Sequence, residues 1–118
     1  MNIMEDWLQA YPKMNLVRCQ SDEMAFGAIN VLQAAKIGLD KMMVIGWDGS
    51  TAGFKYLRNG TMSATAVPSI TTMLAQDMLD YAVRVAKGEN LSGQVVDMAK
   101  KTAACITKEN ADYYEPLL

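Results

Sequence analysis

The stretch Met42-Met43-Val44-Ile45-Gly46-Trp47-Asp48-Gly49-Ser50 decides the fold. Its first four residues are apolar without alternation, which is typical of a strand covered on both faces and therefore favours a parallel sheet. The stretch turns polar at Asp48, so the strand ends there and a loop begins. Ser50 or Thr51 can then open a helix by accepting hydrogen bonds from its free amides.

Outward from this stretch, helical and extended segments alternate along the whole chain. Hydrophobic periodicity predicts helices over 2–11, 21–35, 50–57 and 70–85, extended segments over 15–19, 42–45, 62–67 and within 94–107, and a last helical turn over 110–114 that Thr107 can cap. Short connections between such segments indicate right-handed βαβ crossovers. The expected fold class is α/β, an open parallel sheet with helices on both faces in three layers.

Length and composition exclude several classes of protein. The chain has 118 residues, enough for one domain, and a net charge of -2, which offers no basic field for nucleic acid. Histidine is absent, so imidazole catalysis and a His-ligated zinc site cannot be built within the chain. The sequence contains neither of the two nucleotide-binding glycine motifs, G-x-G-x-x-G and G-x-x-x-x-G-K-[ST]. We therefore expect no enzyme activity, no catalytic residue, no metal and no cofactor.

Five of the ten methionines and both cysteines are expected to fill the core. Met24, Met73 and Met78 lie on helical stripes, and Met42 and Met43 lie in a strand. Cys19 and Cys105 lie far apart in apolar surroundings and form no C-x-x-C motif, so both are expected to be reduced core thiols. No apolar run approaches the roughly 20 residues that span a bilayer, and the first residues do not have the regions of a secretion signal.

Three loops follow the predicted strands, and ligands of open α/β sheets usually bind at that edge. These loops contain Ser21, Asp48 and Pro68. A carboxylate at Asp48 can accept hydrogen bonds from two vicinal hydroxyls, as a sugar or polyol requires. Asp48-Gly49 is also an ordinary turn dipeptide, and Ser21, Asp22 and Asp48 could simply cap helices. Trp47 could stack on a sugar ring or pack in the core.

Four motifs, in order, resemble the C-terminal lobe of ribose-type periplasmic sugar-binding proteins. They read QSDEMAFGA at 20–28, MVIGWDG at 43–49, GTMSATAV at 60–67 with KGE at 87–89, and ITKENAD at 106–112. The resemblance implies a type I periplasmic binding protein lobe that supplies half of a sugar-binding cleft for an ABC importer. It places sugar contacts at Ser21, Asp48 and Pro68. Ser21 stands where the family typically has asparagine, and Pro68 stands approximately where it has glutamine. The resemblance therefore does not identify the sugar.

The resemblance also divides the chain. Residues 1–118 would form a single incomplete lobe, with 94–107 as an extended segment that crosses the hinge and 108–118 as a helical turn and tail. The partners implied are a monosaccharide or related polar solute, an N-terminal lobe outside this chain and a transporter permease, at a periplasmic or extracytoplasmic location. An exposed sheet edge, or exchange of 94–107, would favour self-association.

Two other classes use similar folds. The effector lobe of a lac-type repressor resembles this chain, although no DNA-binding head is present in it. A small α/β enzyme or flavodoxin-like module would need catalytic or nucleotide-binding residues that the sequence does not show.

Overall fold

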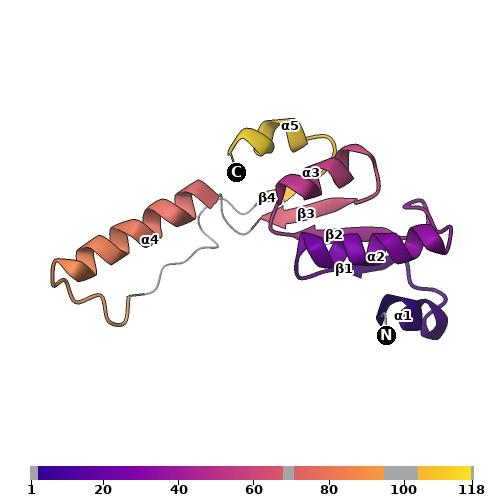
Figure 1. Ribbon diagram of the computed structural model, residues 1–118, viewed down its shortest axis with the longest axis horizontal. Coiled ribbons are helices and arrows are strands. Elements are labelled where there is room, and N and C mark those ends of the chain that lie inside the picture. The colour runs from indigo at the N-terminus through magenta and orange to yellow at the C-terminus, as the bar shows by residue number, and fades with distance from the viewer. Residues whose placement is uncertain (1–2, 68–70, 95–103, 118) are drawn as a thin grey trace.

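A computed structural model describes residues 3–67, 71–94 and 104–117. The elements in chain order are α1 (Ile3–Ala10), β1 (Leu16–Arg18), α2 (Asp22–Ala34), β2 (Met43–Trp47), α3 (Thr51–Arg58), β3 (Ala64–Val67), α4 (Thr71–Ala86), β4 (Ala104–Ile106) and α5 (Ala111–Tyr114), followed by a 3-10 helix over Glu115–Leu117 (Figure 1). The predicted order of helices and strands is confirmed. Of the segment 94–107, residues 95–103 lie outside the described residues, and the extended prediction is confirmed for 104–106.

The two helices next to the central strand begin at serine caps. The Ser21 hydroxyl accepts a hydrogen bond from the Met24 amide at 3.1 Å. The Ser50 hydroxyl accepts one from the Gly53 amide at 3.0 Å. Each cap satisfies an amide that the first helical turn leaves free. Ser50, and not Asp48, is therefore the residue that caps α3.

The sheet has four strands in the order β1-β2-β3-β4. β1 pairs with β2 and β2 with β3 in parallel, whereas β3 and β4 are antiparallel. The α/β open sheet is thus confirmed, but the prediction of a wholly parallel sheet is wrong for its last strand. A three-residue apolar run carries no signal for direction, because parallel and antiparallel pairing accept the same side chains.

Successive residues of a strand point to opposite faces of the sheet, and residues paired in register point to the same face. One face is buried beneath α2 and α3, and its residues are Val17, Val44, Gly46, Thr65, Val67 and Ile106. Phe54 and Leu57 of α3 are almost fully buried against it. This covered face holds the hydrophobic core.

The opposite face of the sheet, which we call the open face, has exposed residues. Leu16 is 45% exposed, Met43 is 48% exposed, and Cys105 is exposed as well. The expected helical layer on both faces is therefore present on one face in the described chain. Met43 and Cys105 are not core residues, contrary to expectation, because no described helix covers the face they occupy.

Helix α4 stands apart from the sheet in Figure 1. The chain measures 57 × 31 × 20 Å, with a radius of gyration of 17.9 Å, whereas a compact chain of this length has about 13.5 Å. Met78 is 66% exposed on α4. The core role expected for Met78 is wrong in this arrangement, as it is for Met24 on α2, whereas Met42 is buried as expected. The side chain of Met73 lies outside the described residues.

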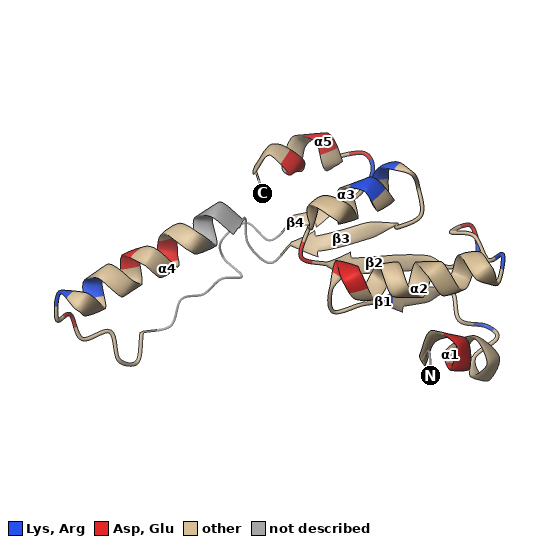
Figure 2. Cartoon of the chain, in the orientation of Figure 1, with Lys and Arg blue, Asp and Glu red and all other residues tan. Residues whose placement is uncertain are grey.

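The C-terminal helix α5 is held against α3 by an ion pair. Arg58 binds Asp112 at 2.7 Å and also Glu115, and Figure 2 shows the acidic residues of α5 beside the basic end of α3. The expectation that Thr107 caps α5 is wrong. The Asn110 side chain instead accepts a hydrogen bond from the Thr107 amide, which closes the turn before the helix.

Both cysteines are free, but only Cys19 is buried. Burial raises the pKa of the Cys19 thiol, because the thiolate would lose its hydration there. Within the described ranges, every helix is too short or too polar to cross a lipid bilayer.

Candidate functional site

Three neighbouring parallel strands end at one edge of the sheet, which we call the carboxyl edge. Ser21 follows β1 after two residues, Asp48 follows β2 directly, and Pro68 follows β3 directly. Because β1, β2 and β3 are adjacent and parallel, their carboxyl ends share one edge, and Ser21 and Asp48 lie there. Pro68 itself lies outside the described residues.

Asp48 has an uncommon backbone conformation. Its φ is 111° and that of Gly49 is 70°. Glycine accepts positive φ freely, but a residue with a Cβ does so at a cost of about 1–3 kcal/mol. The Asp48 amide donates to the Ala66 carbonyl at 3.0 Å, which anchors this strained turn to β3. This hydrogen bond holds the exposed carboxyl at the edge of the sheet despite the strain.

The environment of Asp48 is acidic. Figure 2 shows acidic residues at the start of α2 and in the loop between β2 and α3. Partial desolvation raises the pKa of Asp48, and the nearby carboxylates of Asp22 and Glu23 raise it further, while a hydrogen bond from the Asp22 backbone opposes them. Ser50, two residues after Asp48, also hydrogen-bonds Asp22, so the loop after β2 lies against the first turn of α2. The loops of Ser21 and Asp48 therefore meet at this edge.

A buried carboxylate lies beneath these two loops. Asp22 is fully buried. Its Oδ2 accepts hydrogen bonds from the Ser50 amide at 2.7 Å and the Ser50 hydroxyl at 2.9 Å, and its Oδ1 accepts one from the Thr65 hydroxyl at 2.6 Å. Thr65 in turn accepts from the Gly49 amide at 3.2 Å. Asp22 thus ties α2, the loop after β2 and strand β3 together.

The glycines around Asp22 leave room for its carboxylate. A Cβ at Gly46 would lie 2.2 Å from Asp22 Oδ1, and a Cβ at Gly53 would lie 2.5 Å from Oδ2. Both distances are far below van der Waals contact. Sequence reasoning treated Asp22 only as a possible cap. A signal for a buried hydrogen-bond partner was present in the sequence, because Thr65 is a hydroxyl residue inside an otherwise apolar strand.

Trp47 does not enter the core. It is half-buried at the end of β2, and the Arg18 guanidinium lies 4.9 Å from its ring centroid. This distance is within the range of a cation–π contact. Arg18 and Trp47 both lie on the open face, since their positions alternate with buried residues of the covered face.

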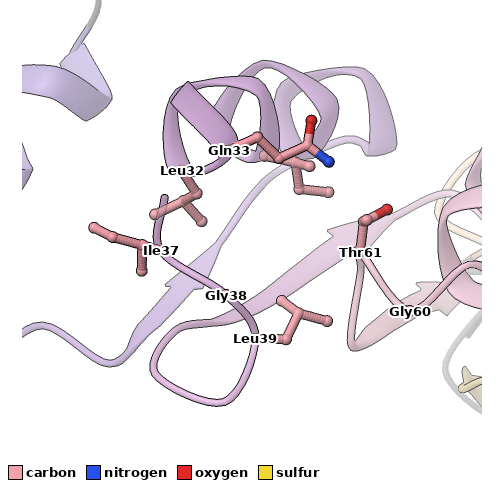
Figure 3. A pocket seen from close by; sticks show the side chains of 8 residues that line it. Leu32, Gln33, Ile37, Gly38, Leu39, Gly60 and Thr61 are labelled. Atoms are coloured by element: carbon pink, nitrogen blue, oxygen red, sulfur yellow. The ribbon is translucent and has the colours of Figure 1, made fainter. Parts of the chain in front are cut away.

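A cavity lies at the other end of the sheet. Its volume is about 110 Å³, and Figure 3 shows that Leu32, Ile37 and Leu39 line it together with Thr61. These residues end α2 or precede β2 and β3, so the cavity is remote from the carboxyl edge. A mainly apolar lining does not suit a polyhydroxylated ligand. Among the described residues, no cluster of acidic or cysteine side chains could hold a metal ion.

Comparison with known proteins places this geometry in a family. The family model described as "Periplasmic binding protein domain" matches residues 1–90. The ribose import binding protein of Salmonella typhimurium is 34% identical over 94 residues, which are 80% of this chain and 31% of that protein. The chain thus spans about a third of the length of this relative.

Two solved structures are similar over nearly the whole chain. An ABC transporter solute binding protein from Bacillus halodurans with bound myo-inositol is 28% identical, with a TM-score of 0.79, over 98% of this chain and 38% of that one. A carbohydrate transporter solute binding protein from Agrobacterium radiobacter in complex with D-arabinose is 29% identical, with a TM-score of 0.76, over 98% and 38%. The family match and the shared fold agree: this chain belongs to the periplasmic binding protein domain family.

Proposed function

We propose that this chain forms one lobe of a solute-binding protein of an ABC import system and supplies half of its ligand cleft. The ligand class is a neutral monosaccharide or a related cyclic polyol. In this proposal the carboxyl edge contacts the solute through Ser21, Asp48 and the loop that begins at Pro68. The chain acts by binding, without catalysis.

The observation that carries the proposal is the position of Asp48. Its carboxyl is exposed at the carboxyl edge, in a strained backbone conformation and beside two other acids. Strain and like charge both cost stability, and such costs gather at functional sites. A carboxylate with two free lone-pair directions is well suited to accept hydrogen bonds from two adjacent hydroxyls.

The known ligands of relatives support the ligand class. The relative from Salmonella is a ribose import binding protein, and the two solved structures hold myo-inositol and D-arabinose. All three solutes are small, uncharged and rich in hydroxyls. Their common chemistry is what an aspartate at the base of a cleft recognises.

The proposal extends to the rest of the receptor. Residues 1–118 form one lobe, 94–107 cross to the second lobe, and 108–118 close the lobe with α5 and the tail. The second lobe supplies the remaining donors, and the assembled receptor serves a permease at a periplasmic or extracytoplasmic location. Two lobes that close on a solute bury it from both sides.

The test is a titration of the isotopically labelled chain with D-ribose, D-arabinose and myo-inositol, followed by amide NMR. We expect shifts at Ser21, Asp48 and Gly49 with a dissociation constant of about 1 mM or weaker, because half of the contacts belong to the other lobe. Asp48→Asn should weaken binding at least about tenfold. The matched control is Asp112→Asn, an exposed aspartate on α5 that should leave binding unchanged.

Two outcomes would overturn the proposal. Shifts confined to the apolar cavity of Figure 3 would place the site at the wrong end of the sheet. Micromolar affinity for the chain alone would mean that the carboxyl edge is a complete site, so the assignment of half a cleft would be wrong.

A further inference from the structure

Two successive amides in the loop after β2 are bound to the neighbouring strand β3. The Asp48 amide donates a hydrogen bond to the Ala66 carbonyl at 3.0 Å. The Gly49 amide donates one to the Thr65 hydroxyl at 3.2 Å. These amides belong to the peptide planes on either side of Asp48, and the orientations of those two planes set the φ and ψ of the residue between them. Both planes that flank the strained Asp48 are therefore fixed to β3.

The two contacts differ in what they depend on. The Ala66 carbonyl is part of the backbone, so it is present whatever side chain stands at that position. The contact to Gly49 depends on a single hydroxyl. Thr65 is fully buried and Gly49 is buried as well, so water does not readily take the place of that hydroxyl. A buried amide without an acceptor is costly, so loss of the hydroxyl should release the peptide plane that follows Asp48.

Asp22 sets the direction of the Thr65 hydroxyl. A threonine hydroxyl has one proton to donate and two lone pairs that can accept. Thr65 donates its proton to Asp22 Oδ1 at 2.6 Å, and a hydrogen bond to a charged carboxylate is stronger than one between neutral groups. The lone pairs of the Thr65 hydroxyl are therefore left to accept from the Gly49 amide.

This pair of contacts explains how the backbone of Asp48 keeps its φ of 111°. A strained conformation of this kind persists only where the surrounding structure over-determines it. One fixed peptide plane leaves the chain free to turn about the remaining bonds, whereas two fixed planes do not. The hydroxyl of Thr65 is the part of this arrangement that a side-chain substitution can remove.

We propose that Thr65 is a positioning residue for the solute site, an inference that rests on the proposed function. Its hydroxyl, oriented by Asp22, fixes the peptide plane after Asp48 and thereby keeps the Asp48 carboxyl in place at the carboxyl edge. Thr65 is fully buried, so it acts through Asp48 and not by contact with the solute. Without the hydroxyl, Asp48 relaxes towards negative φ and its carboxyl turns away from the solute.

The test compares Thr65→Val, which keeps the shape of the side chain and removes the hydroxyl, with Thr65→Ser, which keeps the hydroxyl. Two quantities are measured by NMR of the labelled chain. The first is the three-bond coupling between the amide and Hα protons of Asp48, which depends on φ. The second is the dissociation constant for D-ribose, D-arabinose and myo-inositol. Thr65→Val should increase the coupling and weaken binding by about three- to tenfold, and Thr65→Ser should retain wild-type values of both.

Ser63→Ala is the matched control. The Ser63 hydroxyl accepts a hydrogen bond from the Val44 amide at 3.1 Å, so it also joins a side chain next to β3 to a backbone amide of β2, but at the opposite end of the strands. This variant should leave the Asp48 coupling and the solute affinity unchanged. Urea denaturation of each variant measures its loss of stability. A merely structural role of Thr65 would lower stability without changing the affinity of the folded chain.

Several results would overturn the inference. The first is a wild-type coupling or a wild-type affinity in Thr65→Val. The second is a serine variant that behaves like the valine variant, because the hydroxyl would then not be the group that matters. If Thr65→Val does not fold, Thr65→Ala replaces it in the comparison, and failure of both to fold would mean that Thr65 supports the sheet rather than the site.

Failure of the proposed function has a different signature. A wild-type chain that binds none of the three solutes would refute the proposed function, and the positioning role with it. That failure is recognised because the coupling of Asp48 still changes in Thr65→Val and stays unchanged in Thr65→Ser.

Discussion

Asp22 and Asp48 are two carboxylates at the same edge of the sheet in opposite environments. Asp22 is fully buried and accepts three hydrogen bonds, from the amide and hydroxyl of Ser50 and from the hydroxyl of Thr65. Asp48 is exposed, has a positive φ and has a raised pKa. One aspartate is stabilised by its surroundings, and the other is destabilised by them.

The difference separates the support of a site from its working surface. Asp22 fixes the loop after β2 by bonding Ser50 directly and Gly49 through Thr65. That loop then presents Asp48. A binding group must retain unused hydrogen-bonding capacity, whereas a supporting group should have little left. Substitutions at the two positions should therefore change stability in opposite directions.

The largest effect is expected for Asp22→Ala. The substitution leaves the Ser50 amide and the Thr65 hydroxyl without their acceptor, and hydrogen bonds to a charged group contribute about 1.5–3 kcal/mol each. We expect the free energy of unfolding to fall by about 4 kcal/mol, measured by urea denaturation. Asp112→Ala, which removes an exposed ion pair with Arg58, should cost less than about 1 kcal/mol.

Gly46→Ala tests the space around Asp22 rather than its charge. Its Cβ would lie 2.2 Å from Asp22 Oδ1 and 3.1 Å from Met62 Sδ, so overpacking should cost about 2–3 kcal/mol. Gly27→Ala is the control, because Gly27 lies within α2 with nothing within 4 Å of the new Cβ. Alanine should stabilise that helix by up to about 1 kcal/mol. Equal losses in the two variants would contradict the close packing at Asp22.

Asp48→Gly should have the opposite sign from Asp22→Ala. Glycine accepts the φ of 111° without strain and removes a carboxylate from an acidic neighbourhood. We expect the free energy of unfolding to rise by about 1 kcal/mol in urea denaturation, while sugar binding is lost. A destabilised glycine variant would mean that Asp48 supports the fold as Asp22 does.

The smallest effect is a pH dependence at Asp48. Its pKa is higher in the folded chain than the ordinary 3.8, so the folded state binds the proton more tightly than the unfolded chain. The charge of Asp48 therefore lowers stability as the pH rises through and above 3.8, and the penalty disappears below it. The stability advantage of Asp48→Asn over wild type should shrink between neutral and acid pH. Urea midpoints over a pH series measure it, and an advantage that grew in acid would reverse the sign.

Local patterns predicted most of the helices and strands. Ser21, Ser50 and the apolar run before Asp48 carry their signals within a few residues, because caps and buried strands depend on neighbours in the chain. The antiparallel direction of β4 and the separation of α4 depend on contacts between distant segments. A stripe of apolar residues predicts that a helix needs cover, but not which surface provides it.

The sequence predicted the carboxyl edge only in part. The parallel strands alone place Ser21 and Asp48 at one edge, as the structure has them, while the placement of Pro68 stays a prediction. The role of Asp22 was missed, since its partners Ser50 and Thr65 lie 28 and 43 residues away and an aspartate at a helix start already has a local explanation. The sequence alone does not distinguish a binding role of Asp48 from that of an ordinary turn residue. The strained φ of Asp48 is shown only by the three-dimensional structure.

The free thiol of Cys105 lies on the open face, while that of Cys19 is buried and holds its proton more tightly than usual. Alkylating reagents attack the exposed thiolate form, so modification should begin at Cys105. The chain therefore carries a natural chemical probe in its fourth strand. The speed of a maleimide reaction reports directly on whether that side of the sheet is accessible or covered, without any engineered label.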